Sequence, residues 1–568
     1  MTLRTSSAAL TILGLLTFTG CKDFYDVNTD PLHPSVYTVD QLLPGTQVGM
    51  GTYLGFSLSG LGQATSTLVS QLNSGRGVGS FQQSGSSFSN QWGGLYNDVL
   101  ENNELIIKQA TEKNQLGYLG VAQLQKAYVF SQMVDMWGSI PYSEALKGTG
   151  NGETDRAPRF DKDRDIYLGS ADGKVESLFI LINKGIINVS KGGISNGDLI
   201  YKGDQNKWIA FGNSLKLKLY NQIRLIGSNL PVGYEDSVRM VLTKPLLQSG
   251  NDFELPYGSS FQPENRNISY LSNYVSPGRE DYISQEFFRM MVKKADPRVP
   301  FYFYTQAKAA GGLSDFDTTA VTNGLLPNNV SITMYFATVK LGSTGPLASS
   351  LDNSKLATLP GLYPGGGRFD FGGGTGSSVG ADFSYARGVV AQRLLTTASR
   401  YFTEAEVRLT ILQQDGAAKT AFVRGLTEAF LKVDAIGKAE GSATAVPNIS
   451  GGIIPSIAPT VAPAAPNRAN AYIAAAIARY DAASTPEQKL AVIMYEKYVA
   501  GFGFGEDLWT DYRRTRYPAI RQPGEVPGTI SNGSRPVRLF YDIQELTSNR
   551  NAPREQPAAS EKIFWDVR

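Results

Sequence analysis

The chain has 568 residues, of which 42% are hydrophobic and 18% are charged, and its formal net charge is +2. This composition supports a large folded core, and the near-neutral charge argues against binding of nucleic acid through a basic surface. The single histidine, His33, and the single cysteine, Cys21, exclude a Ser-His-Asp triad, a Cys-His pair, a disulfide framework, haem and iron–sulfur centres. They also exclude Cys/His zinc sites unless His33 serves alone, so we expect no metal and no cofactor.

Residues 1–20 have the layout of a secretory signal peptide, with one early positive charge, an apolar centre and small residues before Cys21. The apolar run Ala8–Leu16 is too short to cross a bilayer, and the small residues are typical of a cleavage site. Because a cysteine at this point is the acylated residue of bacterial lipoproteins, we expect Cys21 to be lipidated. Residues 21–36 would then form a tether between the membrane and the folded domain. The alternative is a plain exported protein with an incidental cysteine.

Residues 37–568 are predicted to form one mostly α-helical domain in which helices follow one another in pairs. Within the second pair, apolar spacing predicts one continuous helix over Asp165–Val189 and a partner from about Gln205 to Ile226. The pairs resemble tetratricopeptide units, although the strict 34-residue consensus is absent. The four pairs lie near residues 98–137, 165–226, 401–436 and 469–513.

Strand is expected to be scarce, with one candidate at Ser331–Tyr335, and long irregular loops separate the helix pairs. Segments 73–92, 365–380 and 440–466 are rich in Gly, Ser or Pro and are predicted to be loops. Loops of this length in a compact domain are often binding elements. We therefore expect a loop-rich, ligand-facing region near residues 73–92 and 250–380.

Several polar or aromatic motifs are better explained by structure than by chemistry. The sequence Trp137-Gly138, followed by Pro141, is typical of a helix end. Glu404 and Glu406 stand two positions apart on a predicted helix, so they point to different faces and cannot flank one glycosidic bond.

Two further motifs have the same structural interpretation. The arginines at 513, 514 and 516, near Asp507 and Asp511, are interpreted as ion pairs that fix helix packing. The segment 161–172 resembles a calcium loop but lacks its central glycine and its final glutamate, so we interpret it as a loop before a helix.

Seven segments, taken in chain order, resemble SusD/RagB-type outer-membrane lipoproteins. Within this family, the chain resembles the divergent SusD-like subgroup. The resemblance extends from Cys21 nearly to the end of the chain. The segments are Lys22–Pro31, Met136–Ala145, Asp198–Arg224, Asp296–Arg298, Phe402–Glu406, Trp509–Thr515 and Arg538–Tyr541.

The resemblance implies a tetratricopeptide-like lipoprotein on the outer surface of the outer membrane. It implies that the protein binds an oligosaccharide or a similar oligomeric nutrient without catalysis. It further implies delivery of that nutrient to a SusC-like TonB-dependent transporter, which the protein would cover as a lid.

A glycan-binding site needs aromatic rings that stack on sugar faces and polar groups that bond to hydroxyls, and it needs neither histidine nor metal. Three segments expected to be loops carry such side chains, at 76–92, 265–282 and 363–371. The ligand-binding candidates are Arg76, Phe81, Trp92, Tyr270, Tyr274, Tyr363, Phe369 and Phe371.

Three alternatives stay open. The protein could bind an extended peptide within the same uptake class, because aromatic and amide groups also suit peptides. It could be a surface glycoside hydrolase that uses two carboxylates. It could also be a scaffold that binds proteins through its helical repeats. Nucleic acid is not an expected partner.

Overall fold

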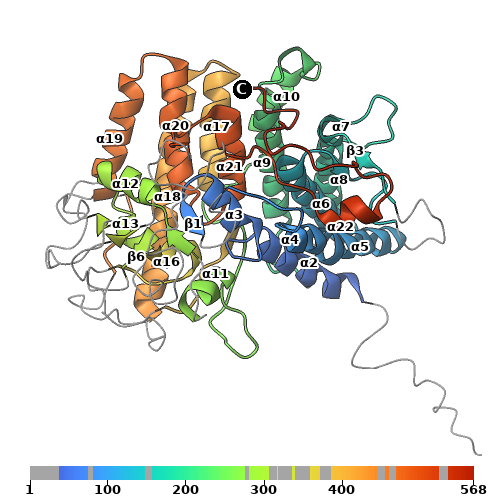
Figure 1. The fold of residues 1–568 in the computed structure, drawn as a ribbon, viewed down its shortest axis with the longest axis horizontal. Coiled ribbons are helices and arrows are strands. Elements are labelled where there is room, and N and C mark those ends of the chain that lie inside the picture. The colour runs from blue at the N-terminus through green and yellow to red at the C-terminus, as the bar shows by residue number, and fades with distance from the viewer. Residues whose placement is uncertain are drawn as a thin grey trace, which may run out of the picture.

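The computed structural model of the protein describes residues 37–74, 81–147, 157–275, 281–305, 316–317, 336–338, 358–370, 386–443, 454–459, 468–522 and 535–568. The described part is mostly helical, and its strands are two to four residues long and pair only two at a time (Figure 1). The predicted mostly α-helical class is confirmed. In this part of the chain, no helix is both long enough and apolar enough to cross a membrane.

Five helices of the first half of the chain form one layer, in which each helix packs against the next along the chain. Helix α6 is almost entirely buried and lies between α5 and α8, and α9 packs against α8 and continues the layer toward the second half. These helices are α2 (Val39–Tyr53), α5 (Glu101–Glu112), α6 (Leu116–Trp137), α8 (Leu178–Lys191) and α9 (Gln205–Ile223).

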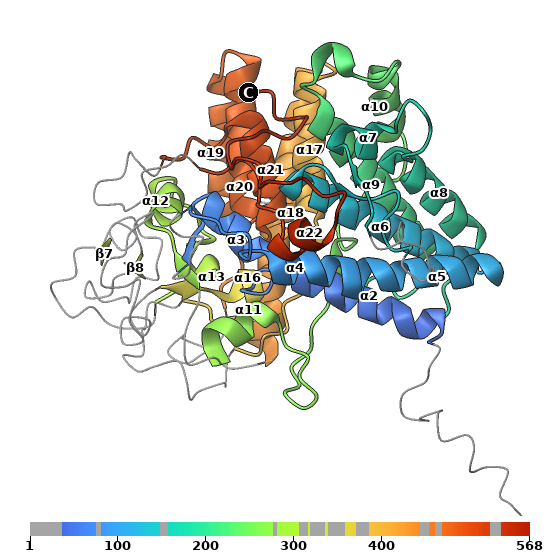
Figure 2. The ribbon, with the colours of Figure 1, turned by 45° about the vertical axis from the view of Figure 1, so that its right-hand side comes forward.

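The second half adds two helical hairpins and a buried helix. Helix α17 packs against α9, α18 and α20, and Figures 1 and 2 show α19 and α20 side by side. Helix α20 begins at a capping box formed by Thr485 and Gln488, and Pro486 occupies its first turn. These helices are α17 (Thr397–Thr410), α18 (Asp415–Ala443), α19 (Arg468–Ala482), α20 (Pro486–Ala500) and α21 (Gly505–Thr515).

The predicted continuous helix over Asp165–Val189 is wrong. The chain forms α7 (Asp163–Leu168) and α8, which are separated by a turn in which Gly169 and Gly173 have φ of +88° and +71°. The hydroxyl of Ser177 then accepts a hydrogen bond from the backbone N–H of Phe179 and starts α8. The candidate strand Ser331–Tyr335 lies outside the described residues.

Shorter elements cover the helical layer and were not predicted from the sequence. Helix α3 consists wholly of buried residues, and the strand pairs β1–β5, β2–β3, β4–β10, β6–β9 and β7–β8 are all antiparallel. The short helical elements are α3 (Leu61–Leu68), α4 (Ser89–Gly93), η3 (Gly94–Leu100), η5 (Gly227–Asn229), α10 (Tyr234–Leu242), α11 (Ile268–Tyr270), η6 (Leu271–Val275), α12 (Gln285–Lys293), α13 (Val299–Tyr302), α16 (Leu362–Gly365) and α22 (Ile543–Ser548). The strands are β1 (Leu72–Ser74), β2 (Ile140–Pro141), β3 (Phe160–Asp161), β4 (Phe253–Leu255), β5 (Asp281–Ile283), β6 (Phe303–Tyr304), β7 (Phe316–Asp317), β8 (Phe336–Ala337), β9 (Leu359–Pro360) and β10 (Gln392–Leu395).

The C-terminal segment 535–568 returns across the first half of the chain and closes the core over the end of α6. The indole N–H of Trp137 donates to the Phe540 carbonyl at 3.0 Å, and the indole N–H of Trp565 donates to Asp135 Oδ1 at 2.9 Å. Helix α6 ends at Trp137 and Gly138 has a φ of +80°, so the predicted helix end is confirmed. This return also brings α22 beside α4 in both ribbon views (Figures 1 and 2).

Candidate functional site

Trp92 lies in α4, where its backbone N–H donates to the Phe88 carbonyl at 2.9 Å, so its predicted position on a loop is wrong. The side chain is 4% exposed and is surrounded by other aromatic rings. The ring centroids of Tyr96 and Trp137 both lie 5.2 Å from that of Trp92, and the centroid of Tyr541 lies 5.8 Å away. Trp92 is therefore an anchor of the core, and its neighbours cover almost all of its side chain.

Trp92 also lines a surface pocket of about 460 Å³, which we call the Trp92 pocket. Its apolar walls come from Trp92, Tyr96 and Pro141, and the Tyr96 hydroxyl is fixed by a 2.7 Å hydrogen bond to the Pro141 carbonyl. Polar side chains form half of the lining, from α4 and η3 on one side and from α22 on the other. These polar residues are Ser89, Asn90, Asn97, Asp542, Gln544, Glu545 and Ser548.

The charged groups in the lining of the Trp92 pocket, as far as the structure describes it, are the carboxylates of Asp542 and Glu545. Burial raises the pKa of Glu545, and Asn549, whose side-chain N–H donates to Glu545 Oε1 at 2.7 Å, opposes this shift. Asp542 accepts a hydrogen bond from the Ser89 hydroxyl, which joins α22 to α4. Carboxylates and amides around an aromatic edge can bond to the hydroxyls of a neutral ligand.

Two of the other predicted ligand residues are a stacked tyrosine pair in the interior. The rings of Tyr270 and Tyr274 are 5.5 Å apart and nearly parallel. Their hydroxyls donate to the carbonyls of Ala386 and Pro360 at 2.7 and 2.8 Å. Both side chains are buried, so the expectation that they are displayed on a loop is wrong.

Tyr363, Phe369 and Phe81 are also buried. Tyr363 stacks on Tyr302 at 4.7 Å, and Phe369 packs edge-on against Phe301 at 4.8 Å. The guanidinium of Arg535 lies 5.0 Å from the centre of the Phe81 ring. These three rings pack against the protein itself and are not displayed as predicted, while Arg76 and Phe371 lie outside the described residues.

Tyr363 also lines a second pocket, of about 420 Å³, which lies between β4, the start of α17 and α18. Lys432 lies in this pocket, and its ammonium is 3.0 Å from Asp252 Oδ2 and 2.7 Å from Glu254 Oε1. Burial acts to lower the pKa of Lys432, but the two carboxylates outweigh the effect of burial and raise the pKa above its ordinary value. Because these opposite charges satisfy one another, this pocket is a weaker candidate than the Trp92 pocket.

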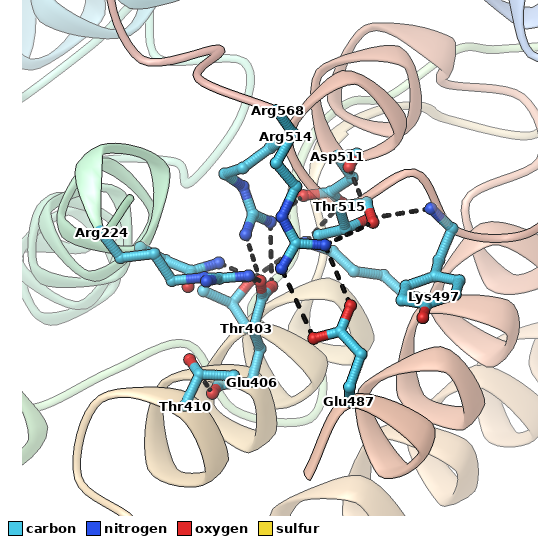
Figure 3. A network of polar contacts seen from close by, with 12 residues as sticks. Arg224, Thr403, Glu406, Thr410, Glu487, Lys497, Asp511, Arg514, Thr515 and Arg568 are labelled. Atoms are coloured by element: carbon cyan, nitrogen blue, oxygen red, sulfur yellow. Dashed lines mark hydrogen bonds and ion pairs between the residues drawn. The ribbon is translucent and has the colours of Figure 1, made fainter. Parts of the chain in front are cut away.

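Glu404 and Glu406 point to different faces of α17, as predicted, and neither is placed as a catalytic acid. Glu406 is buried between Arg224 of α9 and Arg514 of α21 (Figure 3). Glu404 pairs with two arginines of its own helix, Arg400 and Arg408, at 2.7 Å each. Both glutamates therefore form ion pairs that stabilise the packing of α17.

The arginines of α21 were predicted to form ion pairs, and this is confirmed for Arg514 and Arg516. Arg514 pairs with Asp511 at 2.7 Å, and Arg516 pairs with Asp566 at 3.0 Å. Arg513 differs, because its guanidinium donates to the carbonyls of Asp135 and Val537 at 2.6 and 2.8 Å. Burial lowers the pKa of Arg513 to about 9.

The calcium-loop resemblance at 161–172 does not produce a metal site among the described residues. Asp161 accepts hydrogen bonds from the backbone and hydroxyl of Ser143, and Asp163 accepts one from the Phe564 backbone. The described residues contain no group of three or more His, Cys, Asp or Glu side chains that could hold a metal ion.

The sequence did not identify the α22 side of the Trp92 pocket. Gln544 and Glu545 lie about 450 positions beyond Trp92, and no local pattern connects the two segments. The nearby signal was the motif Arg538–Tyr541, which the structure places against α6 and against the Trp92 ring. This motif positions the segment that carries the pocket residues.

The fold and the pocket together define a helical-repeat protein with a ligand-sized concavity outside its helix pairs. A family described as "Starch-binding associating with outer membrane" matches residues 58–339, and one described as "Susd and RagB outer membrane lipoprotein" matches residues 385–559. The chain therefore belongs to the SusD/RagB family of outer-membrane lipoproteins. The family descriptions indicate a binding role for the protein at the outer membrane.

Solved structures have the same fold at low sequence identity. A SusD homolog from Bacteroides fragilis superposes with a TM-score of 0.65 at 17% identity, covering 94% of this chain and 99% of that one. A Bacteroidetes SusD-like protein superposes with a TM-score of 0.64 at 17% identity, and a chitin-binding protein superposes with a TM-score of 0.64 at 18% identity. Each of these two superpositions covers 94% of this chain and 100% of the other chain. No curated protein matches the sequence.

Proposed function

We propose that the protein binds an oligosaccharide or a similar oligomeric nutrient in the Trp92 pocket. It then delivers that nutrient, without catalysis, to a SusC-like TonB-dependent transporter at the cell surface. The observation that carries this proposal is the pocket itself, which Trp92 and Tyr96 line together with exposed amides such as Asn97 and Gln544. This inventory suits sugar rings and their hydroxyls. The chitin-binding protein with the same fold supports a glycan as the ligand.

Asn97→Ala and Gln544→Ala are expected to weaken glycan binding while leaving stability unchanged. Both side chains are exposed in the pocket, from η3 and α22, so each loses a ligand hydrogen bond and no packing. A hydrogen bond contributes about 0.5–1.5 kcal/mol, so its loss raises the Kd by about 2- to 13-fold. Calorimetry with chitin- and starch-derived oligosaccharides measures this effect.

The matched control is Asn229→Ala, an exposed amide in η5 outside the Trp92 pocket. It is expected to bind glycan as the wild type does. If neither pocket variant changed the affinity for a glycan that the wild type binds, the Trp92 pocket would be the wrong site.

The peptide alternative is tested in the same experiment with extended tetrapeptides in place of glycans. Binding of peptides that Asn97→Ala weakens, together with no binding of glycans, would favour the peptide alternative. A protein that bound neither class of ligand would leave the scaffold alternative.

The hydrolase alternative is favoured by one feature, the two carboxylates of Asp542 and Glu545 in one pocket, the second with a raised pKa. Glycoside hydrolysis uses such a pair when one acid is protonated near neutral pH. Release of shorter sugars by the purified protein would support hydrolysis. Binding without turnover supports the uptake role.

Anchoring is proposed to depend on lipid attached to Cys21. Each buried CH₂ contributes about 0.8 kcal/mol and one myristoyl chain gives only marginal binding, so several chains on one residue are needed for stable attachment. Cys21→Ser is expected to leave the folded domain intact and to move the protein out of the outer-membrane fraction, or to leave its signal peptide uncleaved. Cell fractionation and intact-mass measurement follow both effects.

The control for this variant is His33→Ser, in the same predicted tether, which keeps the acylated residue. It is expected to remain lipidated and membrane-bound. A Cys21→Ser protein that was processed and outer-membrane-bound in cells lacking the transporter would contradict lipid anchoring.

A further inference from the structure

A third pocket, of about 400 Å³, lies between the segment that follows α10 and the hairpin of α17 and α18. We call it the Tyr401 pocket, and it has no lining residue in common with the Trp92 pocket. Its charged and aromatic lining residues are Lys244, Arg400, Tyr401, Glu404, Arg408 and Arg424.

The lining of the Tyr401 pocket has a local excess of positive charge. Four of its residues are cationic, and its one carboxylate is Glu404, in a protein whose total formal charge is only +2. Both oxygens of Glu404 are already bonded, one to Arg400 and one to Arg408, at 2.7 Å each. Lys244 and Arg424 are exposed at the rim, so their charge is available to a ligand.

The cations inside the pocket are held in place before any ligand arrives. The Arg400 guanidinium donates to the Leu247 carbonyl through Nε and Nη2, at 2.9 and 2.5 Å. It also lies 3.4 Å from the centre of the Tyr401 ring, and Arg408 Nη1 donates to Gln414 at 3.0 Å. Preorganised groups lose little freedom on binding, which favours affinity for an anion.

The neighbouring side chains are affected by the same positive charge. Lys216 of α9 is half-buried. Its pKa is lowered mainly by burial and further by the positive charge of Lys244. At the other side, Arg424 Nη1 donates to the Tyr401 hydroxyl at 3.4 Å, which places a guanidinium next to the aromatic ring. An aromatic ring with adjacent guanidinium groups suits a sugar ring that bears a negative charge.

We propose that the Tyr401 pocket binds an acidic sugar unit, one that carries a carboxylate or a sulfate ester, of the nutrient. The proposal rests on the proposed function for the nature of the ligand, and it adds a second, charge-selective site to the Trp92 pocket. The volume is large enough for one or two sugar rings, and the exposed rim cations would attract the ligand in a salt-dependent manner.

The test is calorimetry of the full mature protein with trigalacturonate, glucose 6-sulfate and the neutral maltotriose. The Lys244→Gln/Arg424→Gln double variant is expected to bind the acidic sugars at least tenfold more weakly than the wild type. Its melting temperature should be unchanged because both side chains are exposed. Lys113→Gln, an exposed lysine at the end of α5, is the matched control and should bind as the wild type does.

The two acidic sugars, trigalacturonate and glucose 6-sulfate, distinguish recognition of a carboxylate from recognition of a sulfate ester. The proposal is supported if the wild type binds either of them and the double variant binds it more weakly. Acidic-sugar binding that the double variant leaves unchanged would overturn it, as would no binding of either sugar at millimolar concentration. Preference for an acidic peptide such as hexaglutamate over both sugars would also overturn it, in favour of a protein contact. Maltotriose separates this test from that of the proposed function, because the Lys244→Gln/Arg424→Gln double variant should bind this neutral sugar as the wild type does.

Discussion

Glu406→Ala is expected to lower the free energy of unfolding by about 3–5 kcal/mol, the usual effect of removing one partner from a buried ion pair. Glu406 is fully buried and accepts hydrogen bonds from Arg514 at 2.9 Å, Arg224 at 3.1 Å and Asn221 at 2.7 Å. It thereby joins α17 to α9 and α21 (Figure 3). Without it, two buried guanidinium groups lose their main counter-charge. Chemical denaturation of the purified protein measures the loss.

The control is Glu235→Ala, which removes an exposed i,i+4 pair with Arg239 on α10. Such pairs contribute about 0.3–0.5 kcal/mol, so this variant should be nearly as stable as the wild type. Equal losses in the two variants would show that the network around Glu406 does not stabilise the fold.

The same contacts determine how the stability effect depends on pH. Burial acts to raise the pKa of Glu406, but Arg514 and Arg224 outweigh it and hold the pKa below its ordinary value. A carboxylate with a lowered pKa contributes stability above its unfolded pKa of about 4.3, and this contribution is lost as the pH falls through the folded pKa. The difference in stability between the wild type and Glu406→Ala should therefore narrow on acidification below about pH 4.

The paired helices could be predicted because their signals are local. The helix pair predicted near residues 98–137 ends where α6 ends, at Trp137, and the pair predicted near residues 469–513 begins within one residue of α19. Helix α3 escaped prediction for a physical reason. All eight of its residues are buried, so it lacks the polar face from which helical periodicity is recognised.

The proposed ligand site, the Trp92 pocket, could be predicted only in part, because it is assembled from segments far apart in the chain. Trp92 was identified from its type, but its burial depends on Trp137, Phe160 and Tyr541, which the sequence does not bring together. An aromatic residue beside a Gly- and Ser-rich segment gives the same local signal whether it is exposed or packed. The tyrosine pair Tyr270 and Tyr274 was misplaced for the same reason.

Trp92→Ala is therefore expected to destabilise the protein by about 3–5 kcal/mol, the cost of removing a large buried aromatic side chain. This reverses the expectation from a loop position, where the same change would affect binding alone. The indole contacts Tyr96, Trp137, Phe160 and Tyr541, and those contacts join α4 to the end of α6 and to the C-terminal segment. Its removal leaves a cavity that these rings cannot fill without moving.

Thermal unfolding and calorimetry of one set of variants separate the two roles of Trp92. Trp92→Phe keeps a ring in the cluster and should lose less stability than Trp92→Ala, while Asn97→Ala should lose affinity for glycan and no stability. If Trp92→Ala melted as the wild type does, the indole would not be an anchor of the core. If it melted early and Trp92→Phe bound glycan normally, the ring would serve mainly to hold the wall of the pocket, and the exposed amides would provide the contacts to the ligand.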